Sequence, residues 1–239
     1  VEGATTIDGS GMTFGNAMRV SADNVSLGGF TLETSVNGFN GISVLKSSGF
    51  DSNGHPLSGQ GVKNFSIANV TINEHAAGFS GLTLTGVEGA AVNHVTVDNG
   101  GSGNAIQIAD SANVVLTNNT TSNADFGFVI VQNGDATSER TTGVSADTSN
   151  SFGATLAPVS IIDVSTAGPG MGALDIEGFA LAIGTPQHLE LHNGLQGTID
   201  RAAALDATNS FIEGPTGSGV DNNFSGCTGT GTLGTMSIE

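Results

Sequence analysis

A short apolar motif recurs along the first half of the chain at nearly constant spacing. Its copies begin at residues 17, 41, 81, 105 and 127, so the intervals are 24, 40, 24 and 22 residues. The interval of 40 equals one period of 24 plus 16 extra residues. Most of these extra residues fall within 47–61, where turn-forming Ser, Gly, Asn and Pro dominate. A fixed period of this length is the signature of a repeat architecture in which each repeat stacks on the next.

Further short apolar pieces follow the motif in each repeat. Most of them alternate apolar and polar residues over three to five positions, which is the period of a half-buried strand. No helical periodicity competes with this pattern over residues 1–135. Three such strands in 22–25 residues are too closely spaced to pair as hairpins. The pattern therefore predicts an all-β chain in which each strand pairs with its equivalent in the next repeat, as in a parallel β-helix. The pieces are Asn24–Leu27, Asn64–Ile67 and Asn113–Leu116, then Phe30–Leu32, Val70–Ile72, Val95–Val97 and, more weakly, Thr120–Ser122.

The stretch Gly15–Glu33 and the repeats after it resemble the right-handed parallel β-helix proteins of the pectate-lyase-like superfamily. The resemblance implies a right-handed solenoid with coils of about 22–25 residues. It concerns architecture alone, because the same coil serves lyases, hydrolases, epimerases, phage tailspikes and adhesins. We expect one domain over 1–239, with clear repeats over 3–135, an insertion loop at 47–61, and less regular coils and a cap over 136–239. Within this last part, Thr198–Ala207 is expected to form a short C-terminal capping helix.

Stacked repeats place equivalent side chains in columns. The column before the third strand is expected to be a structural turn ladder, because Asn bonds its own backbone and stacks amide on amide. Outward positions of that strand predict a threonine column, which suits the packing of a sheet. A neighbouring acidic and amide column is a weak candidate for calcium, which prefers oxygen ligands. The ladder is Gly29, Asn69, His94 and Asn119, the threonines are Thr31, Thr71, Thr96 and Thr121, and the candidate calcium ligands are Glu33, Asn73, Asp98 and Asn123.

Charge excludes several classes of partner. The chain has 5 Lys and Arg against 22 Asp and Glu, a net charge of −17. Phosphate backbones and anionic membrane surfaces attract clustered Lys and Arg, so we expect neither nucleic acid nor an anionic membrane as a partner. No apolar run reaches the roughly 18 residues that a membrane span needs, so we also expect no membrane insertion. The abundance of Gly, Asn, Ser and Thr with few Lys is typical of a secreted or cell-surface protein.

The catalytic inventory is poor. In the enzymes that the chain resembles, the outer face of the first strand forms the substrate groove, and here its residues include one ionisable side chain, Arg19. Acid–base chemistry on a sugar needs paired titratable groups. The chain also contains no Trp and no Tyr on which sugar rings stack. The column is Arg19, Ser43, Thr83, Gln107 and Val129. The remaining weak catalytic candidates, from the insertion loop and the strand end after it, are Asp51, His55, Glu74 and His75.

These observations favour a non-catalytic structural or adhesive module of a secreted or surface protein that contacts glycans. One alternative is a polysaccharide-active enzyme, a lyase or hydrolase, that works at the 47–61 loop. A second is a calcium-dependent glycan-binding module, and Ca²⁺ is the one cofactor under consideration. The expected partners are polysaccharides or other surface modules, and an open terminal coil would allow end-to-end self-association.

Overall fold

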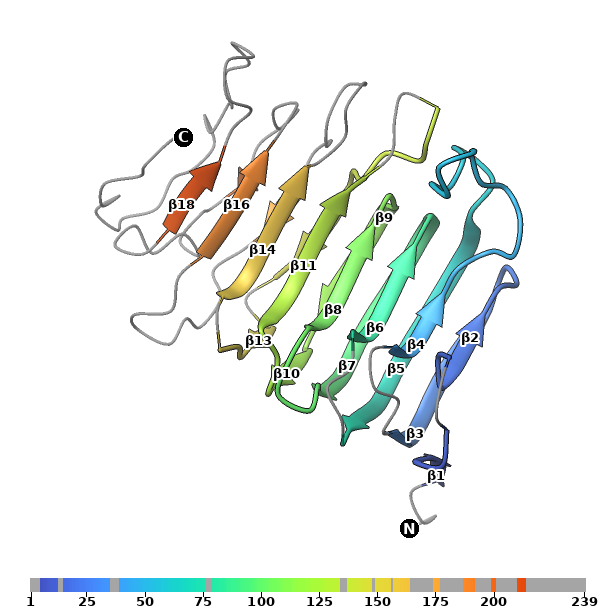
Figure 1. The fold of residues 1–239 in the computed structure, drawn as a ribbon, viewed down its shortest axis with the longest axis vertical. Helices are drawn as coiled ribbons and strands as arrows, with labels where there is room; N and C mark the ends of the chain where they lie inside the picture. The colour runs from blue at the N-terminus through green and yellow to red at the C-terminus, as the bar shows by residue number, and fades with distance from the viewer. Residues whose placement is uncertain are drawn as a thin grey trace.

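The computed structural model describes most of the first two thirds of the chain and four later strands. The described ranges are 5–12, 15–34, 39–75, 79–133, 137–147, 149–155, 157–163, 174–176, 187–191, 199–200 and 210–213. Every regular element within them is a β-strand. Figure 1 shows that these strands lie in two layers, with successive strands of each layer following the order of the chain.

Both layers are parallel sheets. Sheet A contains β1 (Thr5–Gly9), β3 (Ser26–Thr34), β5 (Val62–Glu74), β7 (Val87–Asp98), β9 (Ala112–Thr117), β12 (Val144–Ala146), β15 (Leu174–Ile176) and β17 (Ile199–Asp200), with β10 (Thr120–Ser122) and β13 (Ser151–Phe152) beside this path. Sheet B contains β2 (Met18–Val20), β4 (Asn40–Val44), β6 (Ser80–Thr85), β8 (Asn104–Ala109), β11 (Phe126–Gln132), β14 (Ala157–Asp163), β16 (Gln187–Leu191) and β18 (Ser210–Glu213).

The chain passes back and forth between the two sheets, and each strand pairs with its equivalent in the next repeat. Ile42 of β4 stands opposite Leu82 of β6, although 40 residues separate them in sequence. The insertion at 47–61 therefore leaves the pairing of its two neighbouring repeats intact. The prediction of an all-β chain with parallel pairing is confirmed for the described residues, and the arrangement is compatible with a β-helix.

The strands β3 and β5 each combine two of the predicted pieces, and β7 extends the piece Val95–Val97 toward its N-terminus in the same way. The joint is a residue with left-handed backbone: φ is 73° at Gly29, 55° at Asn69 and 51° at His94. Gly adopts this region freely and Asn and His are enriched there among the other residues, which explains their presence at the joint. A second left-handed column stands earlier in the repeat, where the Asn64 side-chain amide donates to Asn24 Oδ1 at 3.0 Å. Its members are Asn24, Asn64, Gly89, Asn113 and Gly143.

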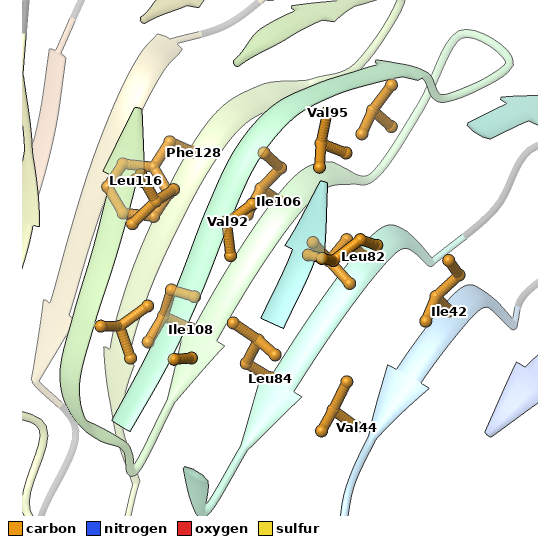
Figure 2. Packing of buried hydrophobic residues seen from close by; sticks show 14 of the residues in the cluster. Ile42, Val44, Leu82, Leu84, Val92, Val95, Ile106, Ile108, Leu116 and Phe128 are labelled. Carbon is orange, nitrogen blue, oxygen red and sulfur yellow. The ribbon is translucent and has the colours of Figure 1, made fainter. Parts of the chain in front are cut away.

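The core fills the space between the sheets with two apolar columns from sheet B. Figure 2 shows residues of both columns beside Val92 and Leu116, which come from sheet A. All of the columns' members named here are fully buried, because the parallel register places every second side chain of a strand on the same face. The columns are Ile42, Leu82, Ile106 and Phe128, and Val44, Leu84, Ile108 and Ile130.

The predicted columns are displaced by one residue in the fourth repeat. Thr120 stands opposite Thr96, so Thr121 is not in the threonine column. The same offset of 24 residues, seen where Asn93 pairs with Thr117, places Asn118 rather than Asn119 after His94 in the turn column. Asn119 and Thr121 are instead buried. The doublets Asn118-Asn119 and Thr120-Thr121 fit either register in the sequence, and only the burial of one face separates the two.

The predicted capping helix is wrong at its beginning. Ile199 and Asp200 form β17, which pairs in parallel with β15 of sheet A. The other residues of the predicted helix, 198 and 201–207, lie outside the described residues.

Asn69 offers a test of the turn column. Asn69→Ala should lower the free energy of unfolding by about 1–2 kcal/mol, because alanine lacks the polar side chain whose local hydrogen bonding lets Asn tolerate the left-handed backbone. Asn69→Gly should retain more stability than Asn69→Ala, since Gly carries no Cβ. Urea unfolding of the three proteins measures both effects. An alanine variant as stable as the wild type would contradict this account of the column.

Candidate functional site

The four catalytic candidates fall into two places rather than one. Asp51 and His55 precede the start of β5, whereas Glu74 is the last residue of β5 and His75 follows it. Strand β5 is 13 residues long. Strand β5 connects the two ends of the repeat, so its length keeps the pairs apart. A single active site that uses all four residues is therefore not formed.

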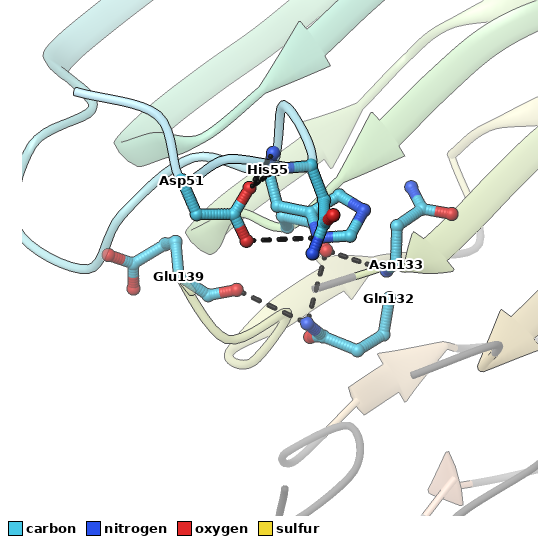
Figure 3. A network of polar contacts seen from close by, with 7 residues as sticks. Asp51, His55, Gln132, Asn133 and Glu139 are labelled. Carbon is cyan, nitrogen blue, oxygen red and sulfur yellow. Dashed lines mark hydrogen bonds and ion pairs between the residues drawn. The ribbon is translucent and has the colours of Figure 1, made fainter. Parts of the chain in front are cut away.

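Asp51 and His55 pair within the insertion loop (Figure 3). Asp51 Oδ1 accepts hydrogen bonds from the backbone N–H groups of Asn53 and His55, at 2.8 and 2.9 Å. Its Oδ2 lies 3.3 Å from His55 Nδ1. The loop thus folds around the carboxylate, which lies close to the imidazole without a hydrogen bond of normal geometry between them. The histidine side chain retains 29% of its exposure, so the ring is partly open to solvent.

The insertion loop packs against a second excursion of the chain, after β11. Leu57 and Ser138 form an antiparallel bridge, and the Glu139 N–H donates to the Pro56 carbonyl at 2.8 Å. The Gly59 N–H donates to Glu139 Oε2 at 2.9 Å. The sequence predicts the first excursion as an insertion loop at 47–61, whereas the second falls in the less regular part that begins at residue 136. The two loops meet because the two repeats between them stack, and no local sequence pattern predicts this contact.

A buried polar network supports the second excursion. Asp110 follows β8 with φ of 45° and is buried, and its Oδ1 accepts from Asn133 N–H at 2.7 Å and from Gln132 Nε2 at 3.1 Å. Gln132 Oε1 accepts from Thr141 N–H at 2.6 Å. Figure 3 shows Gln132 and Asn133 beside the Asp51–His55 pair. The sequence analysis missed Asp110 and Gln132. The network satisfies their polar groups with chain atoms and thereby anchors the excursion.

Of the other two candidates, only His75 lies at the surface, in a cluster with the half-buried Glu33 and Asn73 at the end of β5. His75 Nε2 lies 2.6 Å from Glu33 Oε2, and the Asn73 amide donates to Glu33 Oε1 at 2.8 Å. The bonds from Asn73 and then His75 hold the pKa of Glu33 below its ordinary value, because both stabilise the carboxylate. The next carboxylate in this row, Asp98, accepts from the Asn123 amide at 2.9 Å.

The acidic and amide row is longer than predicted, and its fourth repeat is displaced. Register places Asp8, Glu33, Asn73, Asp98 and Ser122 opposite one another. Asn123 contacts Asp98 from the following position. Among the residues that the structure describes, no group of three or more His, Cys, Asp or Glu side chains is placed to hold a metal ion. The calcium site stays a prediction.

A row of hydroxyl groups runs beside the acidic row on the same outward face of sheet A. Its members are Thr6, Thr31, Thr71, Thr96, Thr120 and Ser151, all exposed or half-buried. Adjacent strands in a sheet lie about 4.7–4.9 Å apart, so the hydroxyl groups repeat at that spacing. Thr6 and Ser151 were not predicted, because the threonine column was predicted only from Thr31 to Thr121.

The first-strand column is not an open groove. Ser43, Thr83 and Val129 retain only 4%, 6% and 2% of their exposure. Arg19 is exposed, and its guanidinium donates to the Lys46 carbonyl at 3.1 Å. Ser43, Thr83 and Val129 are therefore inaccessible to a polymer in this structure, whereas Gln107 is half-buried.

Glu74 is a buried acid rather than a surface residue. It is 4% exposed, and neither carboxyl oxygen makes a hydrogen bond that meets normal geometry. It fits because Gly41 stands above it: a Cβ at Gly41 would lie 2.8 Å from Glu74 Oε1. Burial raises the pKa of Glu74 to about 8, and the nearby Gly41 backbone N–H opposes this shift only in part. At neutral pH the carboxyl is therefore mainly protonated.

Glu74 should make the stability of the protein depend on pH. The folded protein keeps this proton up to about pH 8, whereas the unfolded chain releases it near 4.5. The free energy of unfolding should then fall between pH 4.5 and 8, with a contribution from Glu74 of at most about 1.4 kcal/mol per pH unit. Glu74→Gln should remove this contribution, because the amide resembles the neutral acid.

Glu33→Gln is the matched control for that experiment. Because the pKa of Glu33 is lowered, its carboxylate stabilises the folded protein fully at pH values above the unfolded pKa. This stabilisation is lost only as the pH falls through the folded pKa. Between pH 5 and 8 its substitution should leave the slope unchanged. Urea denaturation at stepped pH measures each slope, and equal slopes for Glu74→Gln and the wild type would contradict the buried neutral acid.

Comparison with known proteins adds no relative to this description. No model of a protein family, no curated protein and no solved structure matches the chain. Within the described ranges, no helix is long and apolar enough to cross a membrane. The described residues support an all-β fold with parallel sheets, and membership of the pectate-lyase-like superfamily stays a prediction.

Proposed function

We propose that this chain is a non-catalytic adhesive or structural module of a secreted or cell-surface protein, and that it contacts polysaccharide through the outward face of sheet A. The observation that carries the proposal is the pair of parallel rows on that face. One row presents hydroxyl groups and the other presents carboxylates and amides, in register over the four strands β1, β3, β5 and β7.

The proposal includes a right-handed parallel β-helix as the scaffold. Its support is the alternation of the chain between two parallel sheets, with equivalent strands as neighbours. Connections between parallel strands of one sheet are right-handed in about 98% of cases, because of the twist of the strands. Stacked coils of this kind extend a binding face in one direction, which suits a long polymer.

The rows offer the groups that a sugar polymer needs. Hydroxyl groups both donate and accept hydrogen bonds, whereas carboxylates accept and amides do both. Repetition at the strand spacing allows many weak contacts to act together along a chain molecule. The net charge of −17 favours a neutral polymer over a polyanion, which the field of the protein would repel.

Binding to insoluble neutral polysaccharides tests the proposal. The wild type should co-sediment with at least one member of a panel of cellulose, chitin, xylan and mannan. The triple variant Thr31→Val, Thr71→Val, Thr96→Val should bind at least about tenfold more weakly, because valine keeps the shape and removes the hydroxyl groups. The control variant Ser26→Ala, Ser66→Ala removes a hydroxyl pair elsewhere on sheet A, whose oxygens lie 2.5 Å apart.

Two results would contradict the proposal: no binding to any member of the panel, or equal binding by the wild type and the threonine variant. The assay should be run with added Ca²⁺ and with a chelator. Binding that requires Ca²⁺, and that Glu33→Gln abolishes, would favour the calcium-dependent version of the same module.

A polysaccharide-active enzyme is the second candidate, and the Asp51–His55 pair is the observation that favours it. The expected outcome is no release of reducing ends or unsaturated products from the same polymers or from pectate and alginate. Product that disappears in His55→Gln and persists in His94→Asn would replace the adhesive proposal. His94→Asn is the matched control because Asn suits the left-handed backbone of that position.

A further inference from the structure

Two phenylalanines lie exposed at the same position of neighbouring repeats. Phe39 and Phe79 are 40% and 56% exposed, and each immediately precedes a strand of sheet B. The Phe79 N–H donates to the Phe39 carbonyl at 2.9 Å, which places the two residues side by side. Their backbones are thus separated by about the spacing of adjacent strands, 4.7–4.9 Å. Neither side chain contributes to the two apolar clusters of the described residues.

The surroundings of this pair are polar. Asn40 follows Phe39, and its backbone and side-chain N–H groups donate to Asn16 Oδ1 at 3.2 and 3.1 Å. His75, which binds Glu33, lies four residues before Phe79, so its Cα is at most about 14 Å from that of Phe79. The two aromatic side chains are therefore followed directly by polar residues, and an imidazole paired with a carboxylate lies within about 14 Å along the backbone.

We propose that Phe39 and Phe79 form a stacking platform for the sugar rings of a neutral polysaccharide. This inference rests on the proposed function and assigns it a specific subsite. A pyranose ring has an apolar face of C–H groups and a polar rim, so it matches an aromatic side chain bordered by hydrogen-bonding groups. Two such side chains on adjacent strands hold successive parts of one polymer.

Charge and size favour a glycan over other occupants. Glu33 and the overall charge of −17 disfavour an anionic polymer at this edge. A stable protein interface buries about 800 Å² on each partner, with an apolar centre. Two phenylalanines bordered by polar groups offer too little apolar area to form such a centre. The platform is also distinct from the first-strand column, whose central positions are buried.

Isothermal titration calorimetry with a soluble form of the neutral polysaccharide that the wild type binds tests the platform. Phe39→Leu and Phe79→Leu should each weaken binding about tenfold, because leucine keeps apolar bulk and removes the aromatic face. Phe79→Tyr should bind within about twofold of the wild type, since its ring is retained. Val115→Ala is the control, because Val115 is 47% exposed on β9 of sheet A, away from the platform.

The outcomes separate this inference from the proposed function. Wild-type affinity in both leucine variants, or an equal loss in Val115→Ala, would overturn the platform and leave the module intact. A wild type that binds no polysaccharide would overturn both. A wild type that sediments as a dimer, with monomeric leucine variants, would assign the phenylalanines to contact with a second copy and overturn the platform. Urea midpoints equal to the wild type show that the variants are folded.

Discussion

Backbone hydrogen bonding between equivalent strands of successive repeats is the interaction on which the rest of the structure depends. Each strand of the two sheets pairs in parallel with a strand that occupies the same position in another repeat. This pairing carries side chains of the same type into columns. An apolar column such as Ile42, Leu82, Ile106 and Phe128 then forms a continuous core that no single repeat could bury alone.

The backbone between the strands must satisfy the same register. Left-handed residues occur within β3, β5 and β7 at Gly29, Asn69 and His94. The strand pairing skips these residues and continues with the same register on both sides of them. Close approach imposes a second condition. A Cβ at Gly81 would lie 2.2 Å from Val97 Cγ1, and one at Gly41 would meet Gly81 O at 2.7 Å. Glycine at these positions allows the first residues of β4 and β6 to pass close to the inward side chains at the ends of β5 and β7.

The two sheets differ in what they offer to a partner. The central outward positions of sheet B are buried, whereas sheet A presents exposed hydroxyl and acidic rows. The two carboxylate–histidine pairs lie at opposite ends of β5, so they do not combine into one acid–base site. This distribution is the basis for proposing contact with an extended polymer. The exposed phenylalanines add apolar area at the edge where the chain enters sheet B.

The sequence by itself determined the repeat, the strands within it and the identity of most columns, because a period of 24 with alternating polarity has one economical folding solution. It also indicated the turn positions, since Gly, Asn and His at equivalent places mark a left-handed backbone. The sequence did not determine the register of the fourth repeat. The doublets Asn118-Asn119 and Thr120-Thr121 fit two registers equally, and the choice depends on which member the neighbouring repeats bury.

Only the tertiary structure decided which candidate residues meet. Loop 47–61 contacts the segment around Ser138 because stacking brings them together across about 80 residues of sequence. Glu74 follows the alternation of the buried residues Val70 and Ile72 and faces inward beneath Gly41, where burial keeps its carboxyl mainly protonated at neutral pH. Phe39 and Phe79 belong to different repeats and become neighbours only through pairing. Local pattern determines strands and turns, whereas contacts between distant residues depend on how the repeats stack, and short-range sequence carries no record of that.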